Sequence, residues 1–305
     1  MSPSFDPANF AGLASLQLKA RYVMEGFLHG IHGSPFHGPS VEFNDYRDYQ
    51  PGDDLRHLDW RLYARNDRLA IKRFEKETNA RGYLLCDTSA SMTYRGERAW
   101  GSKLDCARIL SVALGWFLLR QNDAVGLFAL DGAPDDTESV DPSLFYLQPS
   151  QKRSQLGRLM GAMEGLRPSG AAHLVSLLNR ASEIARRRSL VILFSDLLDP
   201  ADDVTQAFKR LRFDGHDCVV VQILDPDEID FPFQDGTVFE DLETQERRQL
   251  ADSSVRDRYL ERFAAFMESH RQLFRELEIP YAVLRTDEDP GVSLARLLTA
   301  RSTMA

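Results

Sequence analysis

Short apolar runs alternate with segments of helical length from residue 82 onward. Six runs have the length of strands: Tyr83–Cys86, Ala124–Leu130, Leu144–Leu147, Leu190–Phe194, Cys218–Leu224 and Tyr281–Arg285. Segments of helical length separate and follow them: Lys103–Arg120, Gln151–Leu166, Leu174–Arg188, Asp202–Arg212, Val255–Leu277 and Ser293–Arg301. Strands that are apolar throughout are typical of a parallel sheet covered on both faces. The alternation therefore predicts an α/β domain with a doubly wound, mostly parallel central sheet and helices on both faces.

The chain divides into two parts on this pattern. Residues 81–305 are expected to form the α/β domain, with a hairpin over Thr237–Leu250 inside an insertion at about 233–250. Residues 1–80 are expected to form a small N-terminal β-rich segment, which is too short to bury a core alone.

The N-terminal part has its own internal pattern. Residues 26–40 are rich in Gly, His, Pro and Ser and lack helical periodicity, so we expect a loop there. Residues 42–65 are dense in charges and aromatic rings, and Pro51–Asp54 is a turn signal within them. The run Arg68–Phe74 is expected to be a strand.

Composition narrows the class of protein. The 305 residues carry 37 Lys+Arg and 46 Asp+Glu, a net charge of −9, which argues against nucleic acid as a partner. With 43% hydrophobic residues the chain is not disordered, and no apolar run reaches the length of a membrane span. The three cysteines are an odd number in apolar or helical contexts, and no signal peptide is visible. These features predict a cytoplasmic protein.

Candidate chemistry appears where two of the predicted strands end. The run that ends at Cys86 continues into Asp87-Thr88-Ser89-Ala90-Ser91, a D-x-S-x-S pattern, and the run that ends at Phe194 continues into Ser195-Asp196. Ligands of open α/β sheets bind outside the carboxyl ends of the strands. A carboxylate with two hydroxyls and a second carboxylate suits a hard cation such as Mg²⁺. The alternative is that Asp87 and the serines only cap a helix or make a turn.

At these residues the chain resembles two known families. The strand, the D-x-S-x-S pattern and the distal Ser195-Asp196 resemble the metal-ion-dependent adhesion site of a von Willebrand factor A domain. Within residues 42–65, the stretch EF…R.Y.PGDD.R..DW…AR resembles the signature of the domain-of-unknown-function 58 family. Phe239–Thr244 and Tyr281–Asp287 resemble further elements of that family, and the similarity covers about residues 15–300.

The resemblance implies a binding module. In such a domain a metal-bearing face docks partner proteins, and the implied ligands of Mg²⁺ or Mn²⁺ are Asp87, Ser89, Ser91 and Asp196. The family resemblance also implies association with a MoxR-type AAA+ ATPase and with client proteins, as an adaptor or co-chaperone and not as an enzyme.

One position departs from the adhesion-site pattern. Sites of this type take a Thr from a loop that reads roughly G-G-T-x-L, and the matching loop here is Ser169–Leu174, with Ala172 in place of the Thr. Because Ala offers no oxygen, the site loses one ligand, or the water which that ligand orients. Ser169 or His173 could stand in, and the sequence leaves both open.

Two alternative hypotheses, an enzyme and a transition-metal site, involve different chemistry from that of a binding module. A metal-dependent hydrolase or phosphatase could use Asp87, Ser89 and Asp196, but a phosphatase usually needs a second acid where Ser89 stands, and a Ser89 nucleophile would need His173 as its base. His29, His32 and His37 could ligate a transition metal, although no Cys or carboxylate cluster accompanies them. We therefore favour the binding module.

Overall fold

A mixed sheet forms the centre of the computed structural model, which describes residues 5–32, 46–48, 70–72, 80–131, 143–168, 174–199, 201–233, 237–242, 246–249 and 253–295. In these residues six strands lie in the order β10-β7-β6-β3-β4-β5. Their bounds in chain order are β3 Arg81–Cys86, β4 Ala124–Asp131, β5 Ser143–Ser150, β6 Leu190–Ser195, β7 Asp217–Leu224 and β10 Tyr281–Arg285. All neighbours pair in parallel except β5, which is antiparallel to β4. The predicted mostly parallel sheet is confirmed.

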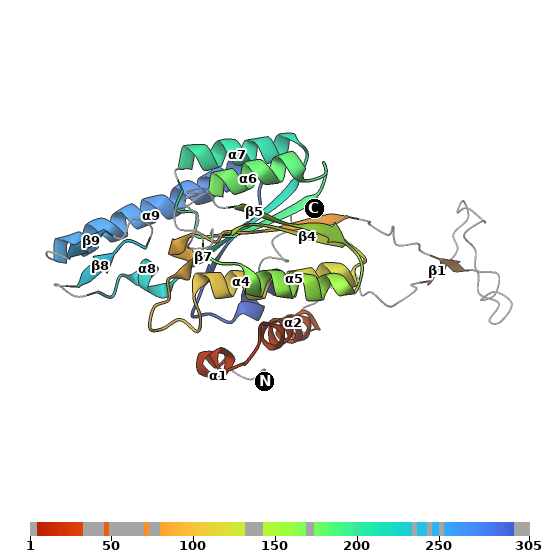
Figure 1. The fold of residues 1–305 in the computed structure, drawn as a ribbon, viewed down its shortest axis with the longest axis horizontal. Coiled ribbons are helices and arrows are strands. Elements are labelled where there is room, and N and C mark those ends of the chain that lie inside the picture. The colour runs from red at the N-terminus through yellow and green to blue at the C-terminus, as the bar shows by residue number, and fades with distance from the viewer. Residues whose placement is uncertain are drawn as a thin grey trace.

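Helices cover both faces of the sheet (Figure 1). The helices α4 (Lys103–Arg120) and α5 (Ser154–Gly165) lie on one face, and α6 (Leu174–Ile184), α7 (Ala201–Phe213) and α9 (Ser253–Glu276) lie on the other. Leu84 of β3 belongs to the core that includes α4 and α5, whereas its neighbour Leu85 belongs to the core that includes α6 and α7. Since successive side chains of a strand point to opposite faces, strands that are apolar throughout supply both cores.

Two N-terminal helices form a further layer that the sequence pattern did not predict. The helix α1 spans Pro7–Ala11, and α2 spans Leu16–His32 and packs on α4 (Figure 1). The loop expected over residues 26–40 is therefore wrong up to His32. Ala20, Val23 and Met24 bury one side of α2 in the core at helical spacing, and this packing offsets the cost of Gly26 and Gly30, about 1 kcal/mol each.

His29 and His32 lie in this helix, and His37 falls outside the described residues. Among the described residues, no helix is long and apolar enough to cross a membrane.

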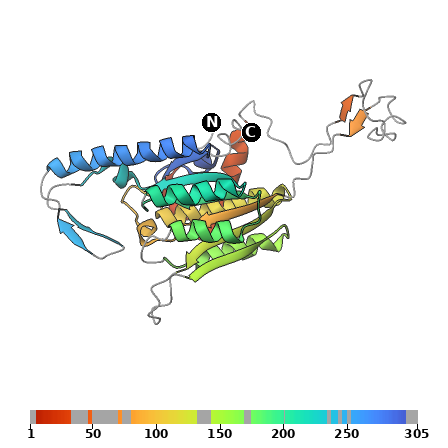
Figure 2. The same ribbon diagram turned by 90° about the horizontal axis from the view of Figure 1, so that it is seen from above.

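Antiparallel pairs occur where the sequence predicted strands and a hairpin. The strands β8 (Val238–Glu240) and β9 (Arg247–Gln249) pair antiparallel, which confirms the hairpin. In Figure 1 and in Figure 2 this hairpin and the adjoining half of α9 project beyond the sheet. In the N-terminal part, β1 (Tyr46–Asp48) pairs with β2 (Ala70–Lys72), inside the run expected to be a strand.

One predicted turn and part of one predicted helix lie outside the described residues, and another helix is shorter than predicted. The Pro51–Asp54 turn and residues 296–301 of the last predicted helix lie outside the described residues, whereas residues 290–295 are helical. The helix expected to reach Arg188 ends at Ile184. The division at residue 80 stays a prediction.

An irregularity in the sheet centres on Gly126 of β4. The register between β4 and β5 shifts between Val125 and Leu127, and a side chain at Gly126 would meet the backbone of β5. A Cβ there would lie 2.9 Å from the carbonyl oxygen of Leu147 and 3.1 Å from Cδ1 of Tyr83. Gly in a strand often marks such a close backbone approach.

We expect Gly126→Ala to lower the free energy of unfolding by about 1–3 kcal/mol, because the added methyl group would force β4 and β5 apart. Gly157→Ala is the matched control, since Gly157 is exposed in α5 and its added Cβ would meet nothing within 4 Å. The control should gain about 0.5–1 kcal/mol from helix propensity. Denaturant unfolding of both variants measures the difference, and equal stability of the two would contradict this account.

Candidate functional site

The strand order reverses between β3 and β6. Counted in chain order from β5 to β10, the strands lie 3-2-1-4-5-6, so chain connections leave to opposite sides at this point. Open α/β sheets bind ligands at such a switch point, beyond the carboxyl ends of the strands. Asp87 follows β3 and Asp196 follows β6, and the backbone N–H of Asp87 donates to the carbonyl of Phe194 over 2.9 Å. The two predicted acidic residues therefore lie at adjacent strand ends.

Asp87 is a buried carboxyl group held by two hydrogen bonds. The backbone N–H of Ser89 donates to Oδ1 over 2.9 Å, and the hydroxyl of Ser195 donates to Oδ2 over 2.5 Å. Burial and the neighbouring Asp196 carboxylate raise the pKa of Asp87 to about 6, while the hydrogen bonds from Ser195 and Ser89 act in the opposite direction. The side chain is thus positioned from both strands, and its charged form is disfavoured by its surroundings.

The two serines of the D-x-S-x-S pattern face each other. Ser89 directly precedes a short 3₁₀ helix over Ala90–Thr93, but its side chain makes no capping bond there. Instead the Oγ atoms of Ser89 and Ser91 lie 3.0 Å apart, as a hydrogen-bonded pair. The turn alternative therefore describes Asp87, which accepts from the Ser89 N–H two residues further on, and neither a cap nor a turn describes the serine hydroxyls.

Asp196 is paired with a lysine that the sequence reasoning missed. The ammonium group of Lys103, at the start of α4, donates to Oδ2 of Asp196 over 2.8 Å and to Oε1 of Glu228 over 2.6 Å. The Lys103 side chain is 0% exposed. Burial lowers the pKa of Lys103, but the two carboxylates outweigh burial and raise it above its ordinary value. The signal available in the sequence was a lysine at the first position of a largely apolar helix.

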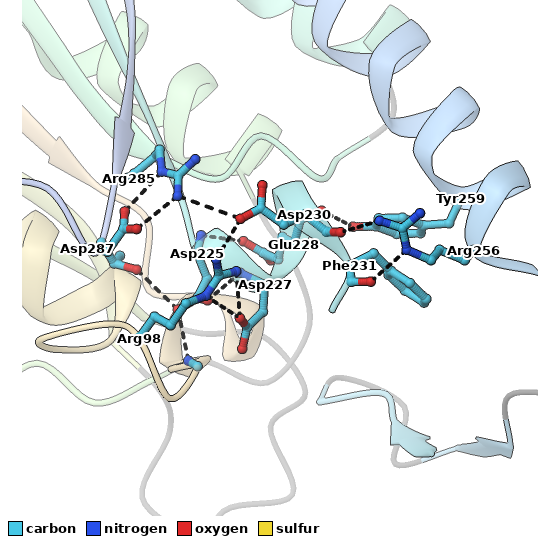
Figure 3. A network of polar contacts seen from close by, with 12 residues as sticks. Arg98, Asp225, Asp227, Glu228, Asp230, Phe231, Arg256, Tyr259, Arg285 and Asp287 are labelled. Atoms are coloured by element: carbon cyan, nitrogen blue, oxygen red, sulfur yellow. Dashed lines mark hydrogen bonds and ion pairs between the residues drawn. The ribbon is translucent and has the colours of Figure 1, made fainter. Parts of the chain in front are cut away.

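An acidic turn after β7 forms the next part of this edge (Figure 3). The short helix α8 (Pro226–Asp230) begins at Asp225, whose carboxylate accepts from the backbone N–H groups of Gly96 and Asp227 and from the hydroxyl of Thr286. Arg98 donates to Asp227 over 3.0 Å and to Asp230 over 2.7 Å. The D-P-D-E-I-D stretch directly after an apolar strand was the sequence signal for this network.

The helix α9 holds α8 from the other side. The hydroxyl of Tyr259 donates to the backbone carbonyl of Glu228 over 2.8 Å, and the guanidinium of Arg256 donates to the carbonyls of Asp230 and Phe231 (Figure 3). Within α8 the backbone N–H of Asp225 donates to Oε2 of Glu228 over 2.8 Å. The carboxylate that meets Lys103 is therefore itself fixed by several elements.

The predicted metal ligands lie close together, and each already makes a hydrogen bond within the protein. In the part of the chain that the structure describes, no group of three or more His, Cys, Asp or Glu side chains is placed to hold a metal ion. Oδ2 of Asp196 accepts a hydrogen bond from the Lys103 ammonium, so a divalent cation at this oxygen atom would meet a like charge. The loop with Ser169, Ala172 and His173 lies outside the described residues, so metal binding stays a prediction.

The hydrolase alternative depends on a residue outside the described part of the chain. The hydroxyl of Ser89 contacts that of Ser91, and the base that the alternative requires, His173, lies outside the described residues. A nucleophilic serine needs a base within hydrogen-bond reach.

Comparisons with known proteins place the sequence among uncharacterised relatives. A family model described as "Protein of unknown function DUF58" matches residues 45–272. The uncharacterized protein Rv1480 of Mycobacterium tuberculosis is 25% identical over 297 residues, which cover 97% of this chain and 90% of that protein. The uncharacterized protein MAV169 of Mycobacterium avium is 27% identical over 117 residues, or 38% of this chain and 68% of that protein.

Solved structures with a similar arrangement share little sequence with this chain. The conserved hypothetical protein BatB from Bacteroides thetaiotaomicron has a TM-score of 0.46 at 14% identity, and the match covers 73% of this chain and 99% of that one. An aerotolerance-related membrane protein from Bacteroides fragilis gives 0.47 at 14% identity with the same coverage. A von Willebrand factor type A structure from Catenulispora acidiphila gives 0.39 at 15% identity, over 77% of this chain and 43% of that one.

The raised pKa of Asp87 predicts a pH dependence of stability. Between the ordinary value of 3.8 and about 6, the unfolded chain releases the proton that the folded protein still holds. The stability contributed by this group is therefore present below pH 4 and is lost as the pH rises toward 6. Asp87→Asn cannot ionise, so wild-type stability relative to this variant should fall by on the order of 1–3 kcal/mol across that range.

Denaturant unfolding at a series of pH values measures this difference. Asp257→Asn, which replaces an exposed carboxylate on α9, is the control and should follow the wild-type profile. A difference between the wild type and Asp87→Asn that is flat, or that rises with pH, would show that Asp87 is not held in a charge-disfavouring environment.

Proposed function

The chain belongs to the DUF58 family of proteins of unknown function, and on that premise we propose that it is a protein-interaction module without enzymatic activity. It docks partners at the carboxyl edge of its sheet. We name the partly or fully exposed side chains around the switch point, Ser91, Thr93 and Leu198, the docking face.

The observation that carries this proposal is an exposed leucine on a rigidly held loop. Leu198 is 50% exposed and lies two residues after Asp196. Its neighbour Leu197 is buried and has a φ of 62°, a conformation that bulky residues rarely adopt. The backbone N–H of Leu197 donates to Oγ of Ser195 over 2.9 Å, and this bond supports the strained conformation. Backbone strain of this kind clusters at functional sites.

An apolar side chain presented by a rigid loop is suited to protein contact. Binding energy at interfaces is concentrated in a few anchors surrounded by polar groups that exclude water. Leu198 has the position of such an anchor, with the hydroxyls of Ser91 and Thr93 on the neighbouring segment after β3. The strain at Leu197 would fix its direction before binding, which lowers the entropy lost on association.

The partner that we propose is a MoxR-type AAA+ ATPase, with this protein as its adaptor or co-chaperone toward client proteins. The support for this choice is the resemblance of residues 42–65 to the family signature. We also propose a cytoplasmic location, because Cys86, Cys106 and Cys218 are all free and buried, as is usual in a reducing compartment.

Leu198→Glu should weaken capture of a purified MoxR-type ATPase by at least about tenfold, since it places a charge in the centre of the interface. Biolayer interferometry with both purified proteins measures the affinity. Phe213→Glu is the matched control, because Phe213 is 88% exposed at the end of α7, on the opposite edge of the sheet.

The control should bind as the wild type does. Undiminished binding by the Leu198 variant would exclude this face as the docking site. Absence of any binding by the wild type would exclude the ATPase as the direct partner.

A further inference from the structure

Lys103 is a charged side chain without access to solvent. Its ammonium group lies between a carboxylate from the end of β6, Asp196, and one from α8, Glu228, at 2.8 and 2.6 Å. An ammonium group is strongly hydrated, and its burial is strongly unfavourable unless carboxylates and hydrogen bonds replace the water. The two carboxylates belong to different elements, so the lysine joins α4, β6 and α8 at one point.

The ammonium group of Lys103 contacts one of the predicted metal ligands, Asp196, at its Oδ2 atom. The four predicted ligands already have polar partners within the protein: Asp87 with Ser89 N–H and Ser195 Oγ, Ser89 with Ser91, and Asp196 with Lys103. A metal ion at Oδ2 of Asp196 would have to displace the ammonium group or share this oxygen atom with it. It would also stand close to a fixed ammonium group in a medium of low dielectric, where like charges repel strongly.

We propose that the Lys103 ammonium is the resident cation of the Asp196 carboxylate and that it supplies to this carboxylate the positive charge which a divalent metal ion supplies in metal-ion-dependent adhesion sites. The positive charge that stabilises the Asp196 carboxylate comes from the chain itself. Docking at the carboxyl edge is then independent of metal.

This assignment also limits the chemistry of the partner. A bound metal ion with an open coordination position attracts a carboxylate of the partner. The Lys103 ammonium is 0% exposed and its charge is neutralised by two carboxylates, so it cannot recruit an acidic side chain in this way. The partner surface expected here is apolar at its centre, opposite Leu198. This consequence for the partner rests on the proposed function, whereas the assignment of the cation does not.

The first experiment uses the wild-type protein alone. Isothermal titration with Mg²⁺ and with Mn²⁺ at millimolar concentrations should give no binding heat, and the melting temperature should not change with either metal. Metal binding that Asp87→Asn abolishes would overturn the assignment, because the metal would then share the site with Lys103.

The second experiment removes the ammonium group. Lys103→Met keeps much of the side-chain volume but leaves Asp196 and Glu228 with no cation, so the melting temperature should fall and should rise again when Mn²⁺ is added. Lys103→Met combined with Glu228→Gln has one carboxylate fewer and provides a folded variant if the single substitution does not fold. In either variant Mn²⁺ should bind at least about tenfold more tightly than in the wild type.

A folded variant that binds Mn²⁺ no better than the wild type would overturn the assignment. The titrations contain no partner, so they decide the question even if the proposed docking fails.

Discussion

The ion pairs of Lys103 bring together the elements that form the carboxyl edge of the sheet. Asp196 fixes the segment after β6, and Glu228 fixes α8, which in turn presents Asp225 to Gly96 and Thr286. Removal of one partner of a buried ion pair leaves an uncompensated charge, which lowers the free energy of unfolding by about 3–5 kcal/mol. The edge therefore behaves as one unit.

The order of the strands explains why this unit lies where it does. β3 and β6 are adjacent in the sheet although more than 100 residues of chain separate them, so Asp87 and Asp196 end side by side. The strands themselves are fixed by apolar cores on both faces, and their ends are correspondingly rigid. A rigid edge can hold Leu197 in a strained conformation that a mobile loop would relax.

Two independent features of this chain support the proposed independence of metal. In the sequence, Ala172 stands where adhesion sites of this type have a Thr ligand, and in the structure the Lys103 ammonium meets Asp196. A D-x-S-x-S pattern alone cannot distinguish a metal site from an internal hydrogen-bond network, because the same carboxylate and hydroxyls can take part in either. On our proposal, the cation beside Asp196 is supplied by the protein itself.

The sequence by itself determined the alternation of strands and helices and the hairpin over Val238–Gln249. It also determined that acidic and hydroxyl groups follow two of the strands. Each of these features depends only on local periodicity or on short spacing along the chain. Tertiary structure alone decided the rest. The helix α2 continues to His32 because its apolar side packs on α4, although its own glycines disfavour it. Lys103 meets Asp196 and Glu228 across 93 and 125 residues of chain, and pairing over such separations depends on which strands are neighbours, a property that no local pattern encodes.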